Sequence, residues 1–473
     1  MSSARHIVVI GGGASGVLVT ARLLDASTAL PVRVTIVEPS GRLGAGVAYG
    51  TEDPDHLVNV RASAMSADPS RPDELLAWVR GEHGGCGPDT FVARRDYRRY
   101  LGHHLARAAA GATAGSFEVR AERAEAIDVV DGGVRVRLST SEVLEAATAV
   151  LAIGNPPPGT PEPFADVSDH PAWVADPWGP GRLASVDRAS RILLVGTGLT
   201  MADVAITLAR DHVEGPGDGP VRLTAISRTG LVPHAHLEVQ PARPMQVIDL
   251  DRDGADVLEL AARLRARGAD GVGSEYPDED WREVIDAVRP FANALWRRFD
   301  VTQRQLFVDR LARDWDVHRH RMAPLTARRV GALRDDGRLS VGRGRVLEVH
   351  AARDDRLRVV VDDGGDVRSE TYDAVVNCTG PGRPWDGRGP SLVSGLLSAG
   401  VAVRDDLGLG LLTDAEGLLV DRCGRSVPEV LVIGPPRRGA LWETTAIPEL
   451  RSQALHIADR IVSDRRPTPV AVR

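Results

Sequence analysis

Short apolar runs alternate with amphipathic stretches along most of the chain. An apolar run at residues 7–10 leads into glycines, a helical pattern through Leu24 and a second strand at 32–38. The same order returns with an apolar run at 193–195, a glycine turn, a helical pattern and a strand at 221–227. Two such strand, turn and helix units predict an α/β fold with two Rossmann-like dinucleotide-binding domains.

Alternating apolar and polar positions follow each unit. The stretches at 117–158 and 344–384 each read as strands joined by Gly or Asp turns, and each closes on an apolar strand that ends in glycine. We interpret them as antiparallel meanders, with Gly154 and Gly380 at the crossings between domains. The first domain is then discontinuous. Its predicted parts are residues 1–157 and 381–473, and the second domain comprises residues 158–380.

Residues from about 240 to 330 interrupt the second domain. Apolar residues recur there at intervals of three and four, which predicts amphipathic helices at 257–267, 281–299 and 304–318. We expect this helical insert to cover the cofactor site of the dinucleotide-binding domains and to shape a substrate pocket.

The first glycine turn has the pattern GxGxxG, formed by Gly11, Gly13 and Gly16. Such glycines let the backbone approach a pyrophosphate, whose charge meets the N-terminus of the following helix. Glu38 ends the next strand, where a carboxylate accepts hydrogen bonds from an adenine ribose. The pattern predicts an FAD site. A strand ending at Gly434 and a helix beginning near Thr445 complete this domain, and that helix N-terminus favours negative charge on a reduced flavin.

The second turn differs where another cofactor would require it. Gly196 and Gly198 open the helix, but the following strand ends in Ser227 and Arg228 instead of an acid. A hydroxyl and a guanidinium suit a 2′-phosphate, so NADPH is the expected ligand. The alternative is that Arg228 is a solvated surface residue.

Composition excludes several function classes. The net charge of −7 without a basic block argues against nucleic-acid or anionic-membrane binding, and no apolar run is long enough to span a bilayer. The N-terminus enters a strand at His6 without a signal peptide, so we expect a cytoplasmic protein. All 58 basic residues are Arg, which excludes Schiff-base and P-loop lysines. The widely spaced Cys86, Cys378 and Cys423 form neither a CxxC dithiol nor a zinc pattern, so no metal is expected.

Several motifs resemble those of a known family. They are residues 41–78 (GRLGAGVAYG through DELLAW), PWGPGRL, GTGLTMAD, SRTGLVPHAH, WDVHRHRMAP and NCTGPG. Together they are similar to the FAD/NAD(P)-binding proteins that include flavin-dependent amino-acid N-monooxygenases, such as those converting aspartate to nitrosuccinate. The resemblance implies that Gly46, Tyr49 and Asn59 lie along the FAD, and Gly196, Gly198, Ser227 and Arg228 along NADPH.

A more distant resemblance is to flavin-containing and Baeyer–Villiger monooxygenases. Their FxGxxxHxxxW fingerprint is matched only by Phe164 and His170, since Asp166 and Val174 replace the glycine and the final aromatic residue. This departure disfavours ketone oxidation. The same resemblance implies that Asn59 stands beside the reactive edge of the flavin, although an Asn there could instead cap a turn.

The segment WDVHRHRMAP closes the predicted insert. Its basic side chains could hold one or two substrate carboxylates through bidentate hydrogen bonds. Alternatively, they pair with Asp314 and Asp316 and tie the insert to its domain. The four residues are His318, Arg319, His320 and Arg321.

These features predict a monooxygenase that uses FAD, NADPH and O2 through a C4a-hydroperoxyflavin. The expected substrate is a small carboxylate-bearing primary amine, with aspartate the first candidate, and the expected reaction is N-oxygenation. A reductase or NADPH oxidase and a non-catalytic flavoprotein remain as alternatives. The oligomeric state and the base that deprotonates the amine stay open.

Overall fold

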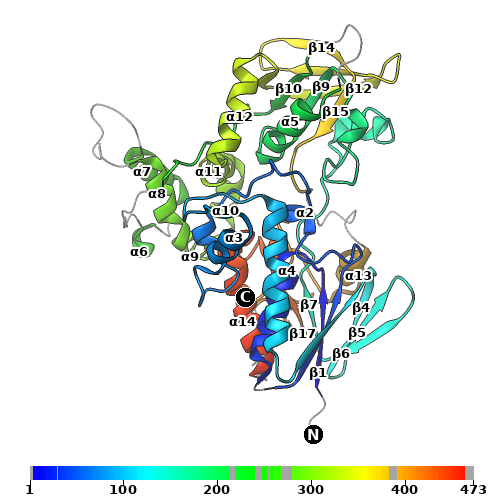
Figure 1. Ribbon diagram of the computed structural model, residues 1–473, viewed down its shortest axis with the longest axis vertical. Helices are drawn as coiled ribbons and strands as arrows, with labels where there is room; N and C mark the ends of the chain where they lie inside the picture. Colours follow the sequence, from blue (N-terminus) through cyan, green and yellow to red (C-terminus); the bar gives the residue numbers. More distant parts are fainter. Residues whose placement is uncertain are drawn as a thin grey trace.

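The computed structural model describes residues 4–28, 30–213, 219–239, 248–253, 256–268, 280–382 and 391–463. Parts of the predicted insert, at 240–247, 254–255 and 269–279, therefore lie outside the described residues. Figure 1 shows two lobes, one above the other, with a helical segment beside their junction. The lower lobe holds both ends of the chain, and the upper lobe is built from its middle.

A six-stranded sheet forms the centre of the lower lobe. Its strand order is β16-β17-β7-β1-β2-β3, and all neighbours are parallel except β16 and β17. The strands are β1 (Arg5–Ile10), β2 (Val32–Val37), β3 (Gly115–Arg120), β7 (Thr148–Leu151), β16 (Leu418–Val420) and β17 (Ser426–Val432). Because β17 pairs with β7, the C-terminal part completes the N-terminal sheet. The predicted discontinuous first domain is confirmed.

Side chains of β1 alternate between two cores, as the period of a strand requires. Ile7 and Val9 pack with helices on one face, whereas Val8 and Ile10 pack against a meander and α13 (Ser391–Ala399) on the other. The main helices of the first face are α1 (Ala14–Asp25), α3 (Glu74–His83), α4 (Arg94–Gly111) and α14 (Ile447–Val462), with the short α2 (Gly46–Tyr49) nearby. The meander consists of β4 (Ala124–Val130), β5 (Gly133–Leu138) and β6 (Val143–Ala146).

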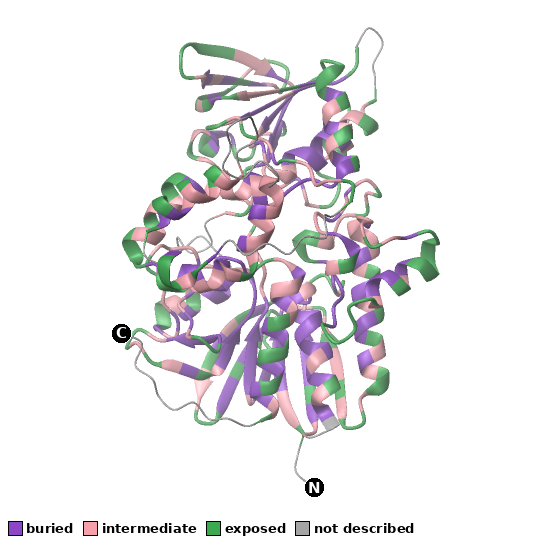
Figure 2. Ribbon diagram, turned by 90° about the vertical axis from the view of Figure 1, so that its left-hand side faces the viewer, coloured by how far each residue is buried: buried purple, intermediate pink, exposed green. Residues whose placement is uncertain are grey.

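The upper lobe repeats this plan with a five-stranded parallel sheet in the order β11-β10-β9-β15-β8. The strands are β8 (Trp173–Val174), β9 (Arg191–Val195), β10 (Arg222–Ser227), β11 (Leu339–Arg343) and β15 (Ala374–Asn377). The helices α5 (Leu199–Asp211) and α12 (Pro324–Asp335) cover one face. A second meander covers the other, formed by β12 (Arg345–Ala351), β13 (Leu357–Asp362) and β14 (Val367–Tyr372). Both predicted dinucleotide units are confirmed, and Figure 2 shows that the central strands of both sheets are mostly buried.

The insert consists of short helices. They are α6 (Leu250–Asp253), α7 (Val257–Arg267), α8 (Trp281–Val288), α9 (Ala292–Arg298), α10 (Val301–Leu306) and α11 (Ala312–Arg319). The continuous helix predicted at 281–299 is interrupted by a 3-10 turn at Arg289–Phe291, because Pro290 has no N–H to donate. A π-helical turn at Phe307–Leu311 joins α10 to α11.

Candidate functional site

The first glycine turn is tightly packed except at one position. A Cβ on Gly11 would lie 2.4 Å from the oxygen of Ala152, and one on Gly16 would lie 2.0 Å from the oxygen of Gly11. Gly13 caps α1, and the nearest atom to a Cβ there is the Cα of Gly46 at 3.6 Å. The helix N-terminus is therefore open at Gly13, where a pyrophosphate can approach the backbone.

The other residues predicted to bind FAD surround this turn. Glu38 accepts hydrogen bonds from the amide of Gly12 at 2.9 Å and from the Ser40 hydroxyl at 2.7 Å. Gly46, at a positive φ of 51°, faces Gly13 and begins α2, which ends at Tyr49. The Tyr49 ring lies 4.7 Å from that of Tyr97, and burial raises the pKa of Tyr49.

The C-terminal part of the lower lobe reaches the same turn. Gly434 follows β17, and a Cβ on it would lie 3.0 Å from the hydroxyl oxygen of Ser15 in the first turn of α1. Its amide is held by Gln453 at 3.1 Å. Thr445 is exposed just before α14, which begins at Ile447. All the predicted FAD residues thus lie on elements that meet at or near the first turn.

The second turn has the same construction. A Cβ on Gly196 would lie 2.3 Å from the oxygen of Cys378, whereas Gly198, which caps α5, has nothing within 4 Å of that position among the described residues. Ser227 forms a hydrogen bond of 2.8 Å with Thr197 and accepts the amide of Gly230 at 3.0 Å. The structure therefore brings Ser227 to the turn.

Arg228 is exposed at the end of β10, and among the described residues it forms no ion pair. Its guanidinium is available to a ligand beside the turn. Sequence reasoning missed a second arginine at this turn. Arg313 of the insert donates to the Thr197 hydroxyl at 3.2 Å and to the Leu231 oxygen at 2.5 Å. The only signal was a cation on an amphipathic helix, which is usually a solvated residue.

The two lobes are joined by polar contacts on α5. Arg94 forms an ion pair of 2.8 Å with Asp203, whose pKa is raised by burial against the lowering effect of Arg94. Arg210 binds Asp53 at 2.7 Å. Against the raising effect of burial, hydrogen bonds from Arg210 and Thr207 lower the pKa of Asp53. The sequence marked the motif GTGLTMAD but gave no sign that its Asp203 reaches the other lobe.

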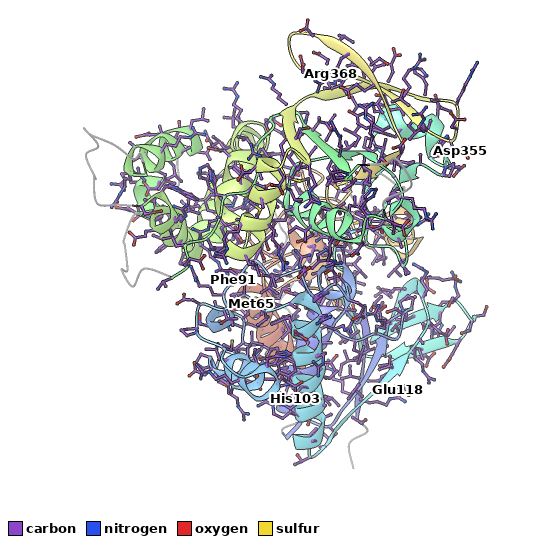
Figure 3. The ribbon with its side chains drawn as sticks, turned by 45° about the horizontal axis from the view of Figure 1, so that its top comes forward. Met65, Phe91, His103, Glu118, Asp355 and Arg368 are labelled. Atoms are coloured by element: carbon purple, nitrogen blue, oxygen red, sulfur yellow. The ribbon has the colours of Figure 1, made fainter. Side chains whose placement is uncertain are left out.

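Asn59 lies close to the junction of the lobes and is half-buried. Its backbone oxygen accepts a hydrogen bond of 3.0 Å from Nε2 of His236. Burial, and then the charge of Arg321, lowers the pKa of His236 to about 3, so the ring is neutral and its proton is on Nε2. The ring of His236 also lies 5.2 Å from the ring of Phe91, and Figure 3 places Phe91 at this junction. The hydrogen bond from His236 thus holds the backbone at Asn59. The side-chain amide of Asn59 has no hydrogen-bond partner among the described residues.

Both arginines of the WDVHRHRMAP segment are buried and already have carboxylate partners. Arg319 lies 3.3 Å from Glu443, which is 3% exposed, and Arg321 contacts Asp286. Glu443 stands two residues before Thr445, so Arg319 connects the insert to the segment that precedes α14. Glu443 is also held by Trp315 at 3.3 Å. Sequence reasoning missed Glu443 because an acid between loop residues carries no periodic signal.

The two histidines face different surroundings. His318 packs against His234 at 4.6 Å and Trp281 at 4.9 Å, and its Nδ1 contacts the backbone oxygen of Asp314 at 2.8 Å. His320 lies 3.8 Å from Asp316, and burial followed by the charge of Arg319 lowers the pKa of His320 to about 3. The pairing of these histidines with Asp314 and Asp316 agrees with the structural interpretation of this segment, while its role in substrate binding stays a prediction.

Residues 8–156 match the family model described as FAD-NAD(P)-binding. They form the N-terminal part of an FAD/NAD(P)-binding domain. This part contains the turn at Gly11 to Gly16, Glu38 and the segment from Gly46 to Asn59. No curated protein matches the chain. Among the described residues, no helix is long and apolar enough to cross a membrane.

Solved structures share the fold over nearly the whole chain. The L-lysine 6-monooxygenase of Pseudomonas syringae is 17% identical, with a TM-score of 0.62 and coverage of 97% of this chain and 99% of that chain. The FAD-bound cadaverine monooxygenase of desferrioxamine biosynthesis from Erwinia amylovora is 14% identical, with a TM-score of 0.60 and coverage of 98% and 95%. A bacillithiol disulfide reductase from Staphylococcus aureus is 11% identical, with a TM-score of 0.52 and coverage of 98% and 99%. The predicted two-domain dinucleotide-binding flavoprotein fold is confirmed.

Proposed function

We propose that this chain is an FAD- and NADPH-dependent monooxygenase that N-oxygenates the primary amine of a small, carboxylate-bearing substrate. One observation carries the cofactor assignment. In each lobe a helix N-terminus is open at a single glycine, Gly13 or Gly198, while the first glycine of the turn, Gly11 or Gly196, packs against the backbone that follows a neighbouring strand. Each open position fits a pyrophosphate. The family match supports FAD in the first lobe, and Ser227 and Arg228 support NADPH in the second.

The cysteines disfavour the disulfide reductases that share this fold. Cys86 and Cys378 are buried, Cys423 is exposed, and all three are free. Burial raises the pKa of Cys378, which keeps its thiol protonated and unreactive. The likeness to the lysine and cadaverine monooxygenases then favours oxygenation of an amine.

The chain's own residues would bind and orient the reactants. Bound FAD, once reduced by NADPH, would supply the activation of O2. Asn59 would donate its free amide to the flavin edge, and the N-terminus of α14 beyond Thr445 would favour negative charge on the flavin. The insert would exclude water from this junction.

The substrate carboxylate is assigned to the segment of Arg319 and Arg321. Because both guanidinium groups are already paired with Glu443 and Asp286, a substrate anion would bind by sharing or replacing these partners. Aspartate is the first substrate to test. The amine must arrive unprotonated, and the partly exposed carboxylate of Asp316, whose pKa is raised by desolvation, is a candidate to accept its proton.

Steady-state NADPH oxidation and peroxide release test the proposal, measured with and without aspartate, other amino acids and diamines. A substrate should accelerate NADPH oxidation and lower the fraction of electrons released as peroxide. Mass spectrometry should then detect one oxygen atom from 18O2 in the product. If no amine changes the peroxide yield or incorporates 18O, the reductase or oxidase function replaces this one.

A further inference from the structure

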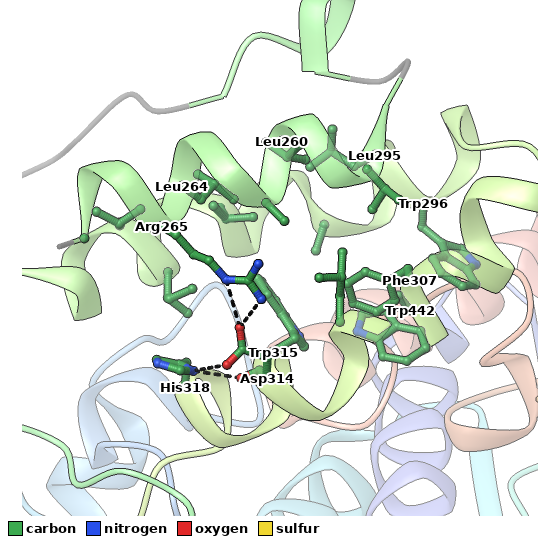
Figure 4. A pocket seen from close by; sticks show the side chains of 18 of the residues that line it. Leu260, Leu264, Arg265, Leu295, Trp296, Phe307, Asp314, Trp315, His318 and Trp442 are labelled. Atoms are coloured by element: carbon green, nitrogen blue, oxygen red, sulfur yellow. Dashed lines mark hydrogen bonds and ion pairs between the residues drawn. The ribbon is translucent and has the colours of Figure 1, made fainter. Parts of the chain in front are cut away.

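The insert contains an apolar cavity of about 250 Å³. Helices α7, α8 and α9, the π-helical turn and α11 surround it, and Trp442 reaches it from the loop before α14. Figure 4 shows the cavity from close by. Its volume suits a ligand with one ring or a branched alkyl group, and Arg319 and Arg321, to which the substrate carboxylate is assigned, do not line it.

Large aromatic side chains make most of one end. Trp296 and Trp442 are 2% and 8% exposed, with ring centroids 5.0 Å apart, and Phe307 packs edge-on to Trp442 at 4.7 Å. The leucines of α7 and α9, Leu260 and Leu295, continue this surface. Such a lining favours an apolar or aromatic body.

The other end is polar. Arg265 donates to Asp314 at 2.7 Å, and His318 lies 3.5 Å from the same carboxylate (Figure 4). Asp314 is therefore paired with Arg265, while Nδ1 of His318 donates to the backbone oxygen of Asp314 at 2.8 Å. Among the described residues, Nη1 of Arg265 has no hydrogen-bond partner, and the side chain of Arg265 is more than half exposed. The mouth thus offers an unused guanidinium donor, which suits an anion better than a cation.

We propose that this cavity is a binding site for an aromatic or branched-alkyl monocarboxylate, with the apolar body against Trp296 and Trp442 and the carboxylate at Arg265. The proposal goes beyond the N-oxygenation, since binding requires neither NADPH nor turnover. Because Trp442 stands three residues before Thr445, a bound ligand also touches the segment that leads to the predicted flavin site.

Calorimetric titration of the oxidised holoprotein tests the proposal, with 3-phenylpropionate as the probe. Its two matched isosteres, 3-phenylpropylamine and 3-phenylpropanol, differ only in the end group. We expect the acid to bind about tenfold more tightly than either isostere, because only the acid gains charge-assisted hydrogen bonds. Equal or tighter binding of the amine would overturn the assignment of a carboxylate.

Two pairs of variants locate the binding. Ala261 lines the cavity on α7, while the adjacent Ala262 is exposed and does not. Ala261→Trp should weaken the binding of 3-phenylpropionate by about tenfold or more because the indole fills the cavity, whereas Ala262→Trp should leave this binding unchanged. Arg265→Gln should reduce the preference for the acid to about that of the alcohol, whereas Gln at the exposed Arg310 should leave it unchanged.

The outcomes separate this site from the proposed function. The proposal is overturned if Ala261→Trp and Ala262→Trp bind 3-phenylpropionate with equal affinity, or if the wild type shows no detectable binding of it. Either result holds whatever substrate the enzyme oxidises. If Ala261→Trp does not fold, as judged by its FAD content, the wild-type comparison of acid, amine and alcohol still decides the end-group chemistry. If the N-oxygenation hypothesis proves wrong, these binding results remain valid, because they require no turnover.

Discussion

Replacing Gly13 and Gly16 by Ala separates cofactor binding from folding. Gly13 has φ −68°, which Ala adopts without strain, and its Cβ would meet only the Cα of Gly46 at 3.6 Å. Ala is a poorer helix cap than Gly, so we expect Gly13→Ala to lower the free energy of unfolding by no more than about 1 kcal/mol. Its methyl group, however, occupies the open face of the turn. Losing one or two charge-assisted hydrogen bonds to a pyrophosphate should weaken the binding of FAD by about ten- to a hundredfold.

Gly16→Ala should behave in the opposite way. Its Cβ would lie 2.0 Å from the Gly11 oxygen, well inside contact distance, so helix α1 or the turn must move. Overpacking of this kind costs about 3 kcal/mol. FAD binding should then fall mainly because the folded state itself is less populated.

The assay combines urea unfolding of the apoprotein with titration by FAD, followed through the quenching of flavin fluorescence. Gly102 on α4, where nothing lies within 4 Å of a Cβ position among the described residues, provides a control for a Gly to Ala change. If Gly13→Ala keeps the FAD affinity of the wild type, the cofactor does not bind at this turn and the reasoning is wrong. Equal loss of stability in both variants would show that Gly13 is packed after all.

Three further predictions follow from the other parts of the site. Arg228→Ala should remove most of the preference for NADPH over NADH, about ten- to a hundredfold in the ratio of kcat/KM values, while FAD content stays unchanged. Asn59→Ala should raise the fraction of electrons released as peroxide without a matching rise in substrate KM, and unchanged peroxide would refute a role at the flavin. Arg94→Ala should destabilise the protein by about 3 kcal/mol at pH 8, because Asp203 is left buried without its cation. That loss should shrink in urea unfolding at lower pH, since burial raises the pKa of Asp203 and its protonated form needs no partner.

Sequence reasoning reached the fold because each βαβ unit carries local signals. Apolar runs, glycines at the turns and acidic or basic residues at strand ends lie within about forty residues of one another, and the structure joins them as expected. The insert was harder to predict. Its helices were found from their periodicity, but Pro290 divides one of them and a π-helical turn interrupts another. Such breaks depend on packing that periodicity does not encode.

Long-range pairs of charged side chains were the part that the sequence could not supply. Arg319 and Arg321 looked available for a substrate because their segment is strongly basic, yet Glu443 and Asp286, which are 124 and 35 residues away, neutralise them. Arg94 and Asp203 are a similar case. A buried guanidinium must find an acceptor, but the chain gives no local sign of which carboxylate provides it.

The cost of leaving a buried charge without its partner distinguishes the buried arginines from the exposed ones. Removing Arg319 would leave Glu443 as an uncompensated buried carboxylate, so its loss must alter stability as well as substrate binding. Arg228 and Arg265 carry no such cost, because both guanidinium groups reach solvent. An anion can therefore bind them without breaking an interior ion pair. Selectivity for the 2′-phosphate and for a ligand carboxylate is accordingly best sought at these two exposed positions, where a change in binding is separable from a change in folding.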